Sequence, residues 1–183
     1  TTSSSTPKAS TCPRARFTLI RSWVSEDASA LVRHVNNPNV TGTLAVRFPR
    51  AYSEEHAKAW IDLCALEADP VNFAIAEGDE AIGGIGLTLQ RGIRRRTAEL
   101  GFWLAEERWG EGIATTVVRA FADFAFAQFD LLRLAAYVFG GNGASARVLE
   151  KAGFAYEGTL HSSIVKDERI VDELVYALVR AEP

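Results

Sequence analysis

The sequence of 183 residues has few of the features that mark specialised classes of protein. Its only two cysteines, Cys12 and Cys64, form neither a spaced disulfide framework nor a CxxC or Cys/His cluster typical of a metal site. No apolar stretch approaches the roughly 20 uninterrupted residues of a membrane span. A disulfide scaffold, a metal centre and a transmembrane protein are therefore not predicted, and we expect a cytoplasmic protein without a metal.

An excess of positive charge is also missing. The chain has 20 Lys and Arg against 23 Asp and Glu, for a net charge of -3, which argues against direct nucleic-acid binding. Apolar residues make up 48%, a globular composition. A chain of this length fits one domain that buries about two thirds of its unfolded surface. We expect a soluble domain over 16–183 after a flexible, Ser/Thr-rich tail over 1–15, which lacks the apolar run of a signal peptide.

Hydrophobic periodicity predicts an alternation of strands and helices. The expected elements are a strand from Phe17, a helix from Ser25 that stops at 36–39, a helix from Ser53 ending before Asp69, strands over 72–77, 81–90 and 97–104, a long helix from Gly112, a strand over 133–139, a helix over 144–152, and strands over 156–162 and 169–179. This order, β-α-α-β-β-β-α-β-α-β-β, predicts an α/β (α+β) fold. Its central sheet is mixed and mostly antiparallel, with flanking helices and a right-handed crossover over 97–139.

The most informative segment is the junction from Leu104 to Thr115, where an apolar strand ends and a loop with Gly110 and Gly112 leads into an amphipathic helix. The first turn of a helix has backbone N–H groups without internal partners, and its dipole favours negative charge. Glycine lacks the Cβ that would hold a phosphate away. The junction therefore predicts an anion site.

Two common phosphate-binding motifs do not fit this junction. A P-loop requires Gly-Lys-Ser or Gly-Lys-Thr, and neither occurs in the chain. The dinucleotide pattern GxGxxG is incomplete, because Thr115 stands at the third glycine position. The preceding strands also form hairpins, whereas that motif belongs to a parallel βαβ series. A nucleotide triphosphatase and a Rossmann enzyme are both disfavoured.

Four segments stand in order along the chain: AELGFWL at 98–104, WGEGIAT at 109–115, NGAS at 142–145, and EKAGF at 150–154 followed by Glu157-Gly158. With these segments the chain resembles the GNAT superfamily of N-acetyltransferases over about Phe17 to Val179. Within that superfamily it resembles the Rim-type group, which acetylates the N-termini of ribosomal proteins.

The resemblance implies that acetyl-CoA is the cosubstrate. The superfamily signature QxxGxG/A then falls on Trp109 to Ala114, with Trp109 in place of Gln or Arg, as is typical of the Rim-type group. The resemblance also implies that the backbone of Trp103 and Leu104 pairs with the pantetheine arm. The pyrophosphate would meet backbone N–H groups of Gly110, Glu111, Gly112, Ile113, Ala114 and Thr115.

Acetyl transfer requires a neutral amine, stabilisation of charge on the thioester oxygen and a proton donor for the departing thiolate. Glu99, in the middle of the strand where the acyl group is expected, is the candidate base, acting directly or through water. The resemblance implies that Asn142 contacts the pantetheine arm and that Ser145 hydrogen-bonds the leaving sulfur. Some Rim-type enzymes place an acidic base seven residues after the Glu of Glu157-Gly158, where this chain has Ile164.

Structural interpretations stand beside these roles. Asn142 fits an N-cap as well as a cofactor contact, and Ser145 fits a first-turn hydroxyl. Glu99 could equally lie on the solvent face of its strand or pair with an arginine. Four arginines at 91, 94, 95 and 96 fit a solvated hairpin, and also a patch that attracts an acidic acceptor. The three histidines lack metal spacing.

The function predicted is transfer of an acetyl group from acetyl-CoA to a primary amine by direct attack, assisted by a general base. A protein or peptide N-terminal α-amine is the preferred acceptor, because its pKa near 7.7–8.0 makes it easier to neutralise than lysine. Polyamines, amino acids and aminoglycosides are the alternative acceptors. A non-catalytic acyl-CoA-binding module is the third reading. The sequence leaves the oligomeric state open, including a homodimer.

Overall fold

The computed structural model describes residues 18–44, 49, 51–67 and 70–180. The expected tail over 1–15 lies outside these residues, as do Cys12 and Phe17. Within the described ranges, no helix is both long and apolar enough to cross a membrane.

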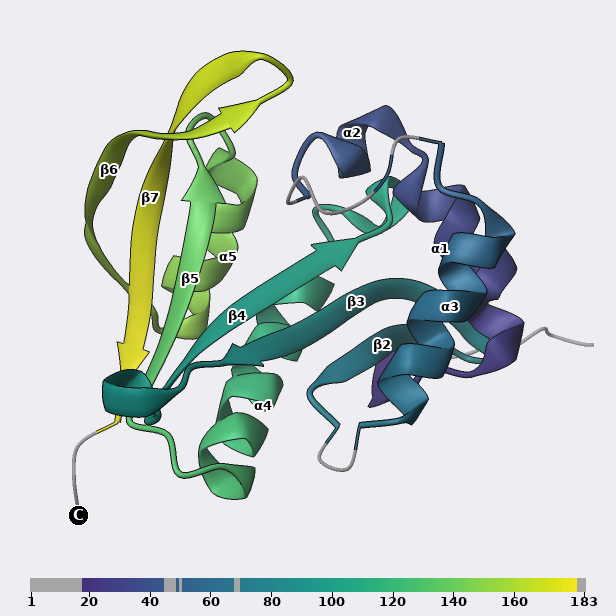
Figure 1. Ribbon diagram of the computed structural model, residues 1–183, viewed down its shortest axis with the longest axis horizontal. Coiled ribbons are helices and arrows are strands. Elements are labelled where there is room, and N and C mark those ends of the chain that lie inside the picture. Colours follow the sequence, from purple (N-terminus) through teal and green to yellow (C-terminus); the bar gives the residue numbers. More distant parts are fainter. Residues whose placement is uncertain (1–17, 45–48, 50, 68–69, 181–183) are drawn as a thin grey trace, which may run out of the picture.

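Seven strands form one sheet at the centre of the fold: β1 (Thr18–Arg21), β2 (Asn72–Glu77), β3 (Glu80–Leu89), β4 (Thr97–Leu104), β5 (Arg133–Phe139), β6 (Ala155–Lys166) and β7 (Arg169–Val179) (Figure 1). Their order across the sheet is β1-β2-β3-β4-β5-β7-β6. Only β4 and β5 pair in parallel, and the other neighbours are antiparallel. The mixed, mostly antiparallel sheet predicted from the sequence is confirmed.

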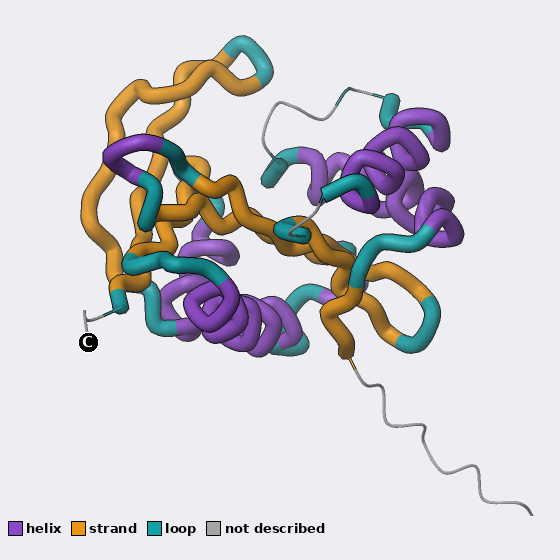
Figure 2. Tube along the Cα trace, turned by 60° about the horizontal axis from the view of Figure 1, so that its bottom comes forward, coloured by secondary structure: helices purple, strands orange, loops and turns teal. Residues whose placement is uncertain are grey.

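Helices cover both faces of this sheet, as Figure 2 shows. On one face lie α4 (Ile113–Gln128) and α5 (Gly143–Ala152). On the other lie α1 (Ala28–Val35), the short α2 (Pro38–Thr41) and α3 (Glu54–Ala65). The serine before α3 caps it, because the Ser53 hydroxyl accepts the His56 N–H at 3.3 Å.

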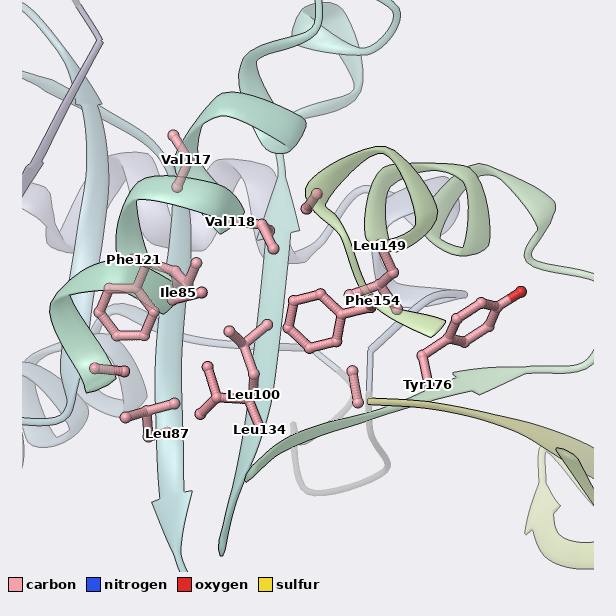
Figure 3. Packing of buried hydrophobic residues seen from close by; sticks show 14 of the residues in the cluster. Ile85, Leu87, Leu100, Val117, Val118, Phe121, Leu134, Leu149, Phe154 and Tyr176 are labelled. Atoms are coloured by element: carbon pink, nitrogen blue, oxygen red, sulfur yellow. The ribbon is translucent and has the colours of Figure 1, made fainter. Parts of the chain in front are cut away.

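A hydrophobic core fixes α4 and α5 against the sheet (Figure 3). Phe121 of α4 and Leu149 of α5 are fully buried, together with Leu134 of β5. Burial of each such side chain contributes about 1.5–3 kcal/mol. Burial of these α4 side chains holds the whole helix in place, and therefore also fixes the position of its first turn relative to β4.

A second core lies on the opposite face, between the sheet and α1 with α3. Trp23 and Leu31 are buried here beside Ile61 of α3. Trp23 approaches the backbone of β3 so closely that a Cβ on Gly84 would lie 3.1 Å from its ring. This core holds the N-terminal helices over the same strands that α4 covers from the other side.

One predicted boundary was wrong, and one short helix was missed. The first helix ends at Val35, next to the predicted stop at 36–39, but Asn37 then begins α2: its side-chain oxygen accepts the Asn39 N–H at 2.9 Å, and Pro38 occupies the first turn. The strand predicted to end at Ser162 continues to Lys166. An irregularity in pairing between Leu160 and Ile164 allows this continuation, with Ser162 at a φ of 52°.

The feature that shapes the site is a wedge in the middle of the sheet. The register between β4 and β5 runs only over Thr97↔Arg133, Ala98↔Leu134 and Glu99↔Ala135. Beyond these pairs the two strands diverge, as Figure 1 shows. One edge of β4 after Glu99 therefore faces the opening of the wedge and no longer pairs with β5.

Candidate active site

The loop that follows β4 has the geometry of an anion site. Gly110 and Gly112 have φ angles of +81° and +79°, a region that side chains with a Cβ rarely adopt. Gly112 is the N-cap of α4 and supplies no side-chain oxygen to the helix. A Cβ at either glycine would meet no atom within 4 Å. The loop therefore leaves both the N–H groups and the space before α4 accessible to a ligand.

A smaller cavity of about 300 Å³ lies in front of this loop. Three cations line it: Arg108, Arg147 and Lys151. Arg108 also pairs with Glu77, whereas Arg147 and Lys151 have no carboxylate partner among the described residues. Sequence analysis missed these cations, although Arg147 and Lys151 stand four residues apart on one side of α5. The smaller cavity suits an anionic ligand.

Most of the residues expected to bind the cofactor come together in this smaller cavity. Its walls include Trp103, Leu104, Trp109, Gly110, Gly112, Ala114, Thr115, Asn142 and Ser145. Glu111 and Ile113 are not among the lining residues. The exposed Glu111 carboxylate lies 3.6 Å from Arg108, and Ile113 packs against the core. A role for either would therefore involve its backbone N–H.

Contacts with α1 and α2 anchor the turn that precedes the loop. Glu106 accepts hydrogen bonds from the side chains of Asn37 and Asn39, at 2.8 and 2.7 Å. Glu107 lies 3.4 Å from Nδ1 of the buried His34. Burial lowers the pKa of His34 despite its carboxylate neighbours. Further along, the Trp109 indole donates to the Leu104 carbonyl at 2.8 Å, which fixes the end of β4.

A larger cavity of about 730 Å³ adjoins the smaller one. The two share Thr43, Phe102, Trp103, Asn142 and Ser145 as lining residues. The larger cavity extends over β3, β4 and β5, with α3 on one side and β7 on the other. A ligand in the smaller cavity and a second ligand in the larger one would therefore meet at Asn142 and Ser145.

Glu99 projects into the larger cavity from a floor of small residues. It stands opposite Thr88 on β3 and Ala135 on β5. Two positions along β4, a Cβ at Gly101 would meet no atom within 4 Å, so the space next to Glu99 on this strand is open. Glu99 is half-buried and has no hydrogen-bond or ion-pair partner among the described residues. Glu99 therefore neither pairs with a described arginine nor lies fully exposed to solvent, the two structural alternatives considered for it.

Asn142 and Ser145 form a preorganised pair at the start of α5. The Asn142 Oδ1 accepts the Ser145 N–H at 3.1 Å, so Asn142 is the N-cap. Its Nδ2 donates to the Ser145 hydroxyl oxygen at 3.0 Å. Because the Ser145 oxygen is already an acceptor, its own proton is directed to another partner. This arrangement presents a hydroxyl donor where the two cavities join.

The larger cavity also contains carboxylates that sequence analysis missed, Glu67 and Glu173. Glu173 stands next to Asp172 in β7, so the sequence of this strand did not distinguish it as a functional position. By contrast, Ile164 of β6 pairs with Val171 of β7 and lines neither cavity. The arginines of the 91–96 turn line neither cavity either.

Comparisons with known proteins agree with this geometry. A family model described as the acetyltransferase (GNAT) domain matches residues 18–155. The chain is 30% identical over 167 residues to the uncharacterised N-acetyltransferase YoaA of Bacillus subtilis, covering 88% of this chain and 93% of that protein. It is 29% identical over 170 residues to the uncharacterised N-acetyltransferase p20 of Bacillus licheniformis, covering 91% and 94%.

Solved structures share the fold. RimJ of Mycobacterium smegmatis, in complex with CoA-disulfide, has a TM-score of 0.78 at 24% identity, covering 88% of this chain and 81% of that one. A ribosomal-protein-S5-alanine acetyltransferase from Vibrio fischeri has a TM-score of 0.77 at 20% identity, covering 90% and 96%. The first is named RimJ, and the second is named a ribosomal-protein acetyltransferase.

Proposed function

This chain belongs to the GNAT acetyltransferase family and is an acetyl-CoA-dependent N-acetyltransferase, and we propose that its acceptor is the N-terminal α-amine of a protein or peptide. The observation that carries the proposal is the larger cavity, which opens beside Ser145 and is wide enough for the first residues of a peptide. Two Rim-type structural neighbours support it.

The smaller cavity fits acetyl-CoA. Backbone N–H groups from Gly110 to Thr115 would hold the pyrophosphate, and Arg147 with Lys151 would neutralise phosphate charge. Trp103 and Leu104 lie at the end of β4, along the edge that leaves β5, where an extended pantetheine arm can pair with the backbone. Bound there, the cosubstrate supplies an acetyl thioester at the junction of the two cavities.

Glu99 acts as the general base in this scheme. Its carboxylate accepts a proton from the acceptor ammonium, directly or through one water, and leaves a nucleophilic amine. The neutral amine nitrogen bonds to the thioester carbonyl carbon and loses a second proton to solvent, and the carbon–sulfur bond breaks. The Ser145 hydroxyl donates a hydrogen bond to the departing sulfur, which takes its proton from solvent. One N–H is thereby exchanged for one S–H.

The chemistry of the acceptor favours an α-amine. An α-amino group has a pKa near 7.7–8.0 and lysine near 10.4, a difference of about 3 kcal/mol in the cost of forming the neutral amine. A single unpaired carboxylate is sufficient for the first and much less effective for the second. The half-buried Glu99 is such a carboxylate.

The test uses one peptide in two forms, with a free N-terminus and with that N-terminus blocked, and the same internal lysine in both. A panel of polyamines, amino acids and aminoglycosides is assayed in parallel, and free-thiol release from acetyl-CoA is the readout. We expect turnover only with the free N-terminus. Equal turnover of the blocked peptide, or turnover of small amines alone, would overturn the assignment.

A further inference from the structure

The walls of the larger cavity carry charge of one sign. Glu67, Glu99 and Glu173 line it from three different parts of the chain. Among its described lining residues there is no Lys or Arg, and His56 is the only basic side chain. The cation-rich smaller cavity next to it shows that this asymmetry is local and does not follow from the overall composition.

Within the part of the chain that the structure describes, no Lys or Arg side chain pairs with these carboxylates. None of the three forms an ion pair with a described residue. Glu67 accepts the Val71 N–H at 3.2 Å, and Glu173 accepts the Ser163 hydroxyl at 3.0 Å. A carboxylate has about four acceptor sites, so each retains capacity for a further donor. Cavity walls of low dielectric concentrate the resulting negative potential.

The negative charge extends beyond the point of attack. Glu99 stands opposite Ala135 of β5, and Glu173 stands opposite Phe139, four residues further along the same strand. Four residues of a strand span roughly 13 Å. An acceptor whose amine reaches Glu99 can therefore place a second group near Glu173.

Two aromatic residues of β5 lie near these carboxylates on the same face of the sheet. Tyr137 lies between the positions opposite Glu99 and Glu173, and Phe139 is itself opposite Glu173. Tyr137 and Phe139 both line the larger cavity, and Tyr137 is 42% exposed. The ammonium group of Lys166 already lies 4.7 Å from the centroid of the Phe139 ring, which shows that a cation is accommodated on this surface. Aromatic faces and carboxylates together favour an extended cation.

We propose that the preferred acceptor carries a second positive charge, separated by several bonds from the amine that is acetylated. For a peptide acceptor this means Lys or Arg immediately after the N-terminal residue. A polyamine presents the same chemistry. The inference rests on the proposed function of the same site, with Glu173 as the residue that recognises the second charge. A preference for cationic acceptors is the opposite of the preference for acidic acceptors that the 91–96 turn suggested. The arginines of that turn line neither cavity.

Three peptides test the proposal, identical except for Lys, Gln or Glu at the second position. We expect kcat/KM to fall in that order, by about tenfold from Lys to Gln, and the difference to shrink as salt screens the charges. Equal values, or a preference for Glu, would overturn the proposal. A polyamine is compared in parallel with a monoamine of similar length.

A charge-neutral variant identifies the residue responsible. Glu173→Gln keeps an acceptor for the Ser163 hydroxyl but loses the charge, so the Lys-to-Gln ratio should fall toward one. Glu55→Gln on α3 and Arg95→Gln in the 91–96 turn are matched controls outside both cavities, and both should keep the wild-type ratio. An unchanged ratio in Glu173→Gln would remove Glu173 from the proposal. A loss of activity on the Glu peptide in Arg95→Gln would instead support the turn.

The outcomes for the two proposals are separable. A charge preference among polyamines without acetylation of free N-termini would retain the cationic acceptor and reject the N-terminal assignment. Acetylation of free N-termini without a charge preference would do the reverse.

Discussion

The two cavities meet at Asn142 and Ser145 and yet are built in different ways. The smaller one lies between one side of α5 and the loop from β4 to α4, where glycine conformation leaves backbone N–H groups accessible. The larger one is assembled from side chains of α3, β3, β4, β5 and β7. In the proposed scheme, binding of the cofactor depends on local backbone geometry, and choice of the acceptor depends on which side chains the whole fold brings together.

The largest effect is expected where the two cavities act on one reaction. Glu99→Gln should lower turnover by about 10²–10⁴ at neutral pH while leaving acetyl-CoA affinity nearly unchanged. The loss should shrink as pH rises past the pKa of the amine, because the acceptor then loses its proton without help. Steady-state rates across pH, with calorimetric binding of acetyl-CoA, measure both effects. Wild-type turnover in Glu99→Gln, with a large loss in Glu173→Gln, would move the base to Glu173.

The role of backbone N–H groups in the smaller cavity can be tested by the change in Tm of the protein on addition of acetyl-CoA. Acetyl-CoA at about a hundred times its dissociation constant should stabilise the protein by roughly 2.7 kcal/mol. Gly112→Val should abolish most of that shift, because a branched side chain at a φ of +79° displaces the loop and projects toward the pyrophosphate.

The control for that variant is a second glycine with the same conformational requirement. Gly92 has a φ of +63° with open space around it, and lies outside both cavities. Gly92→Val should lower the Tm of the free protein through backbone strain and still show the full shift with acetyl-CoA. If a folded Gly112→Val keeps its shift, the phosphates are bound elsewhere.

The junction between the cavities gives a smaller effect. Asn142→Asp keeps an oxygen that caps α5, but its second oxygen would accept the Ser145 proton that Nδ2 leaves available. We expect an unchanged Tm and a loss of about tenfold in kcat, the value of one hydrogen bond near 1.4 kcal/mol.

Two further variants separate capping from proton orientation. Asn142→Ala should lower stability by about 1 kcal/mol through loss of the cap. In a Ser145→Ala background, Asn142→Asp should cost little further activity, because both changes act on the same hydroxyl. Additive losses in kcat would show that Asn142 acts independently of Ser145.

The smallest effect concerns His34, which contacts Glu107 in the turn before the loop that leads into α4. The pKa of His34 is lowered in the folded protein, chiefly by burial, so the unfolded chain binds a proton at a pH where the folded one does not. Stability should therefore fall as pH drops from about 6.5, the ordinary pKa of histidine, toward the lower folded value. His34→Gln should flatten this part of the curve in denaturant unfolding measured from pH 7.5 to 5. An unchanged slope would assign the acid sensitivity to other groups.

The sequence predicted features that depend on local patterns. The bounds of β2 and β4 and the start of α4 followed from periodicity and from turn glycines, and Gly110 with Gly112 also predicted an anion site. The short α2 was missed because Asn37-Pro38 is typical both of a helix end and of a helix start. Here one helix ends and another begins, and the side chains of Asn37 and Asn39 bind Glu106, which lies 67 or more residues away in the chain.

The acceptor side could not be predicted in the same way. Glu67 and Glu173 are 106 positions apart in the chain. They share a cavity because β4 and β5 diverge and leave an opening between α3 and β7. No spacing rule relates them. Asp172 and Glu173 are adjacent acidic residues in β7, and only the fold shows that Glu173 is the one that lines the cavity.

The wedge also has a consequence for aggregation. An unpaired strand edge ordinarily invites a strand from another molecule to add to the sheet. The edge of β4 beyond Glu99 is unpaired inside the sheet, where β5 forms the opposite wall. The hairpin of β6 and β7 reaches toward the segment after α2, and Lys166 donates to the Leu44 carbonyl at 2.7 Å. A single extended chain can enter such a slot, whereas a second sheet is too broad, so we expect this edge to admit a ligand without promoting aggregation.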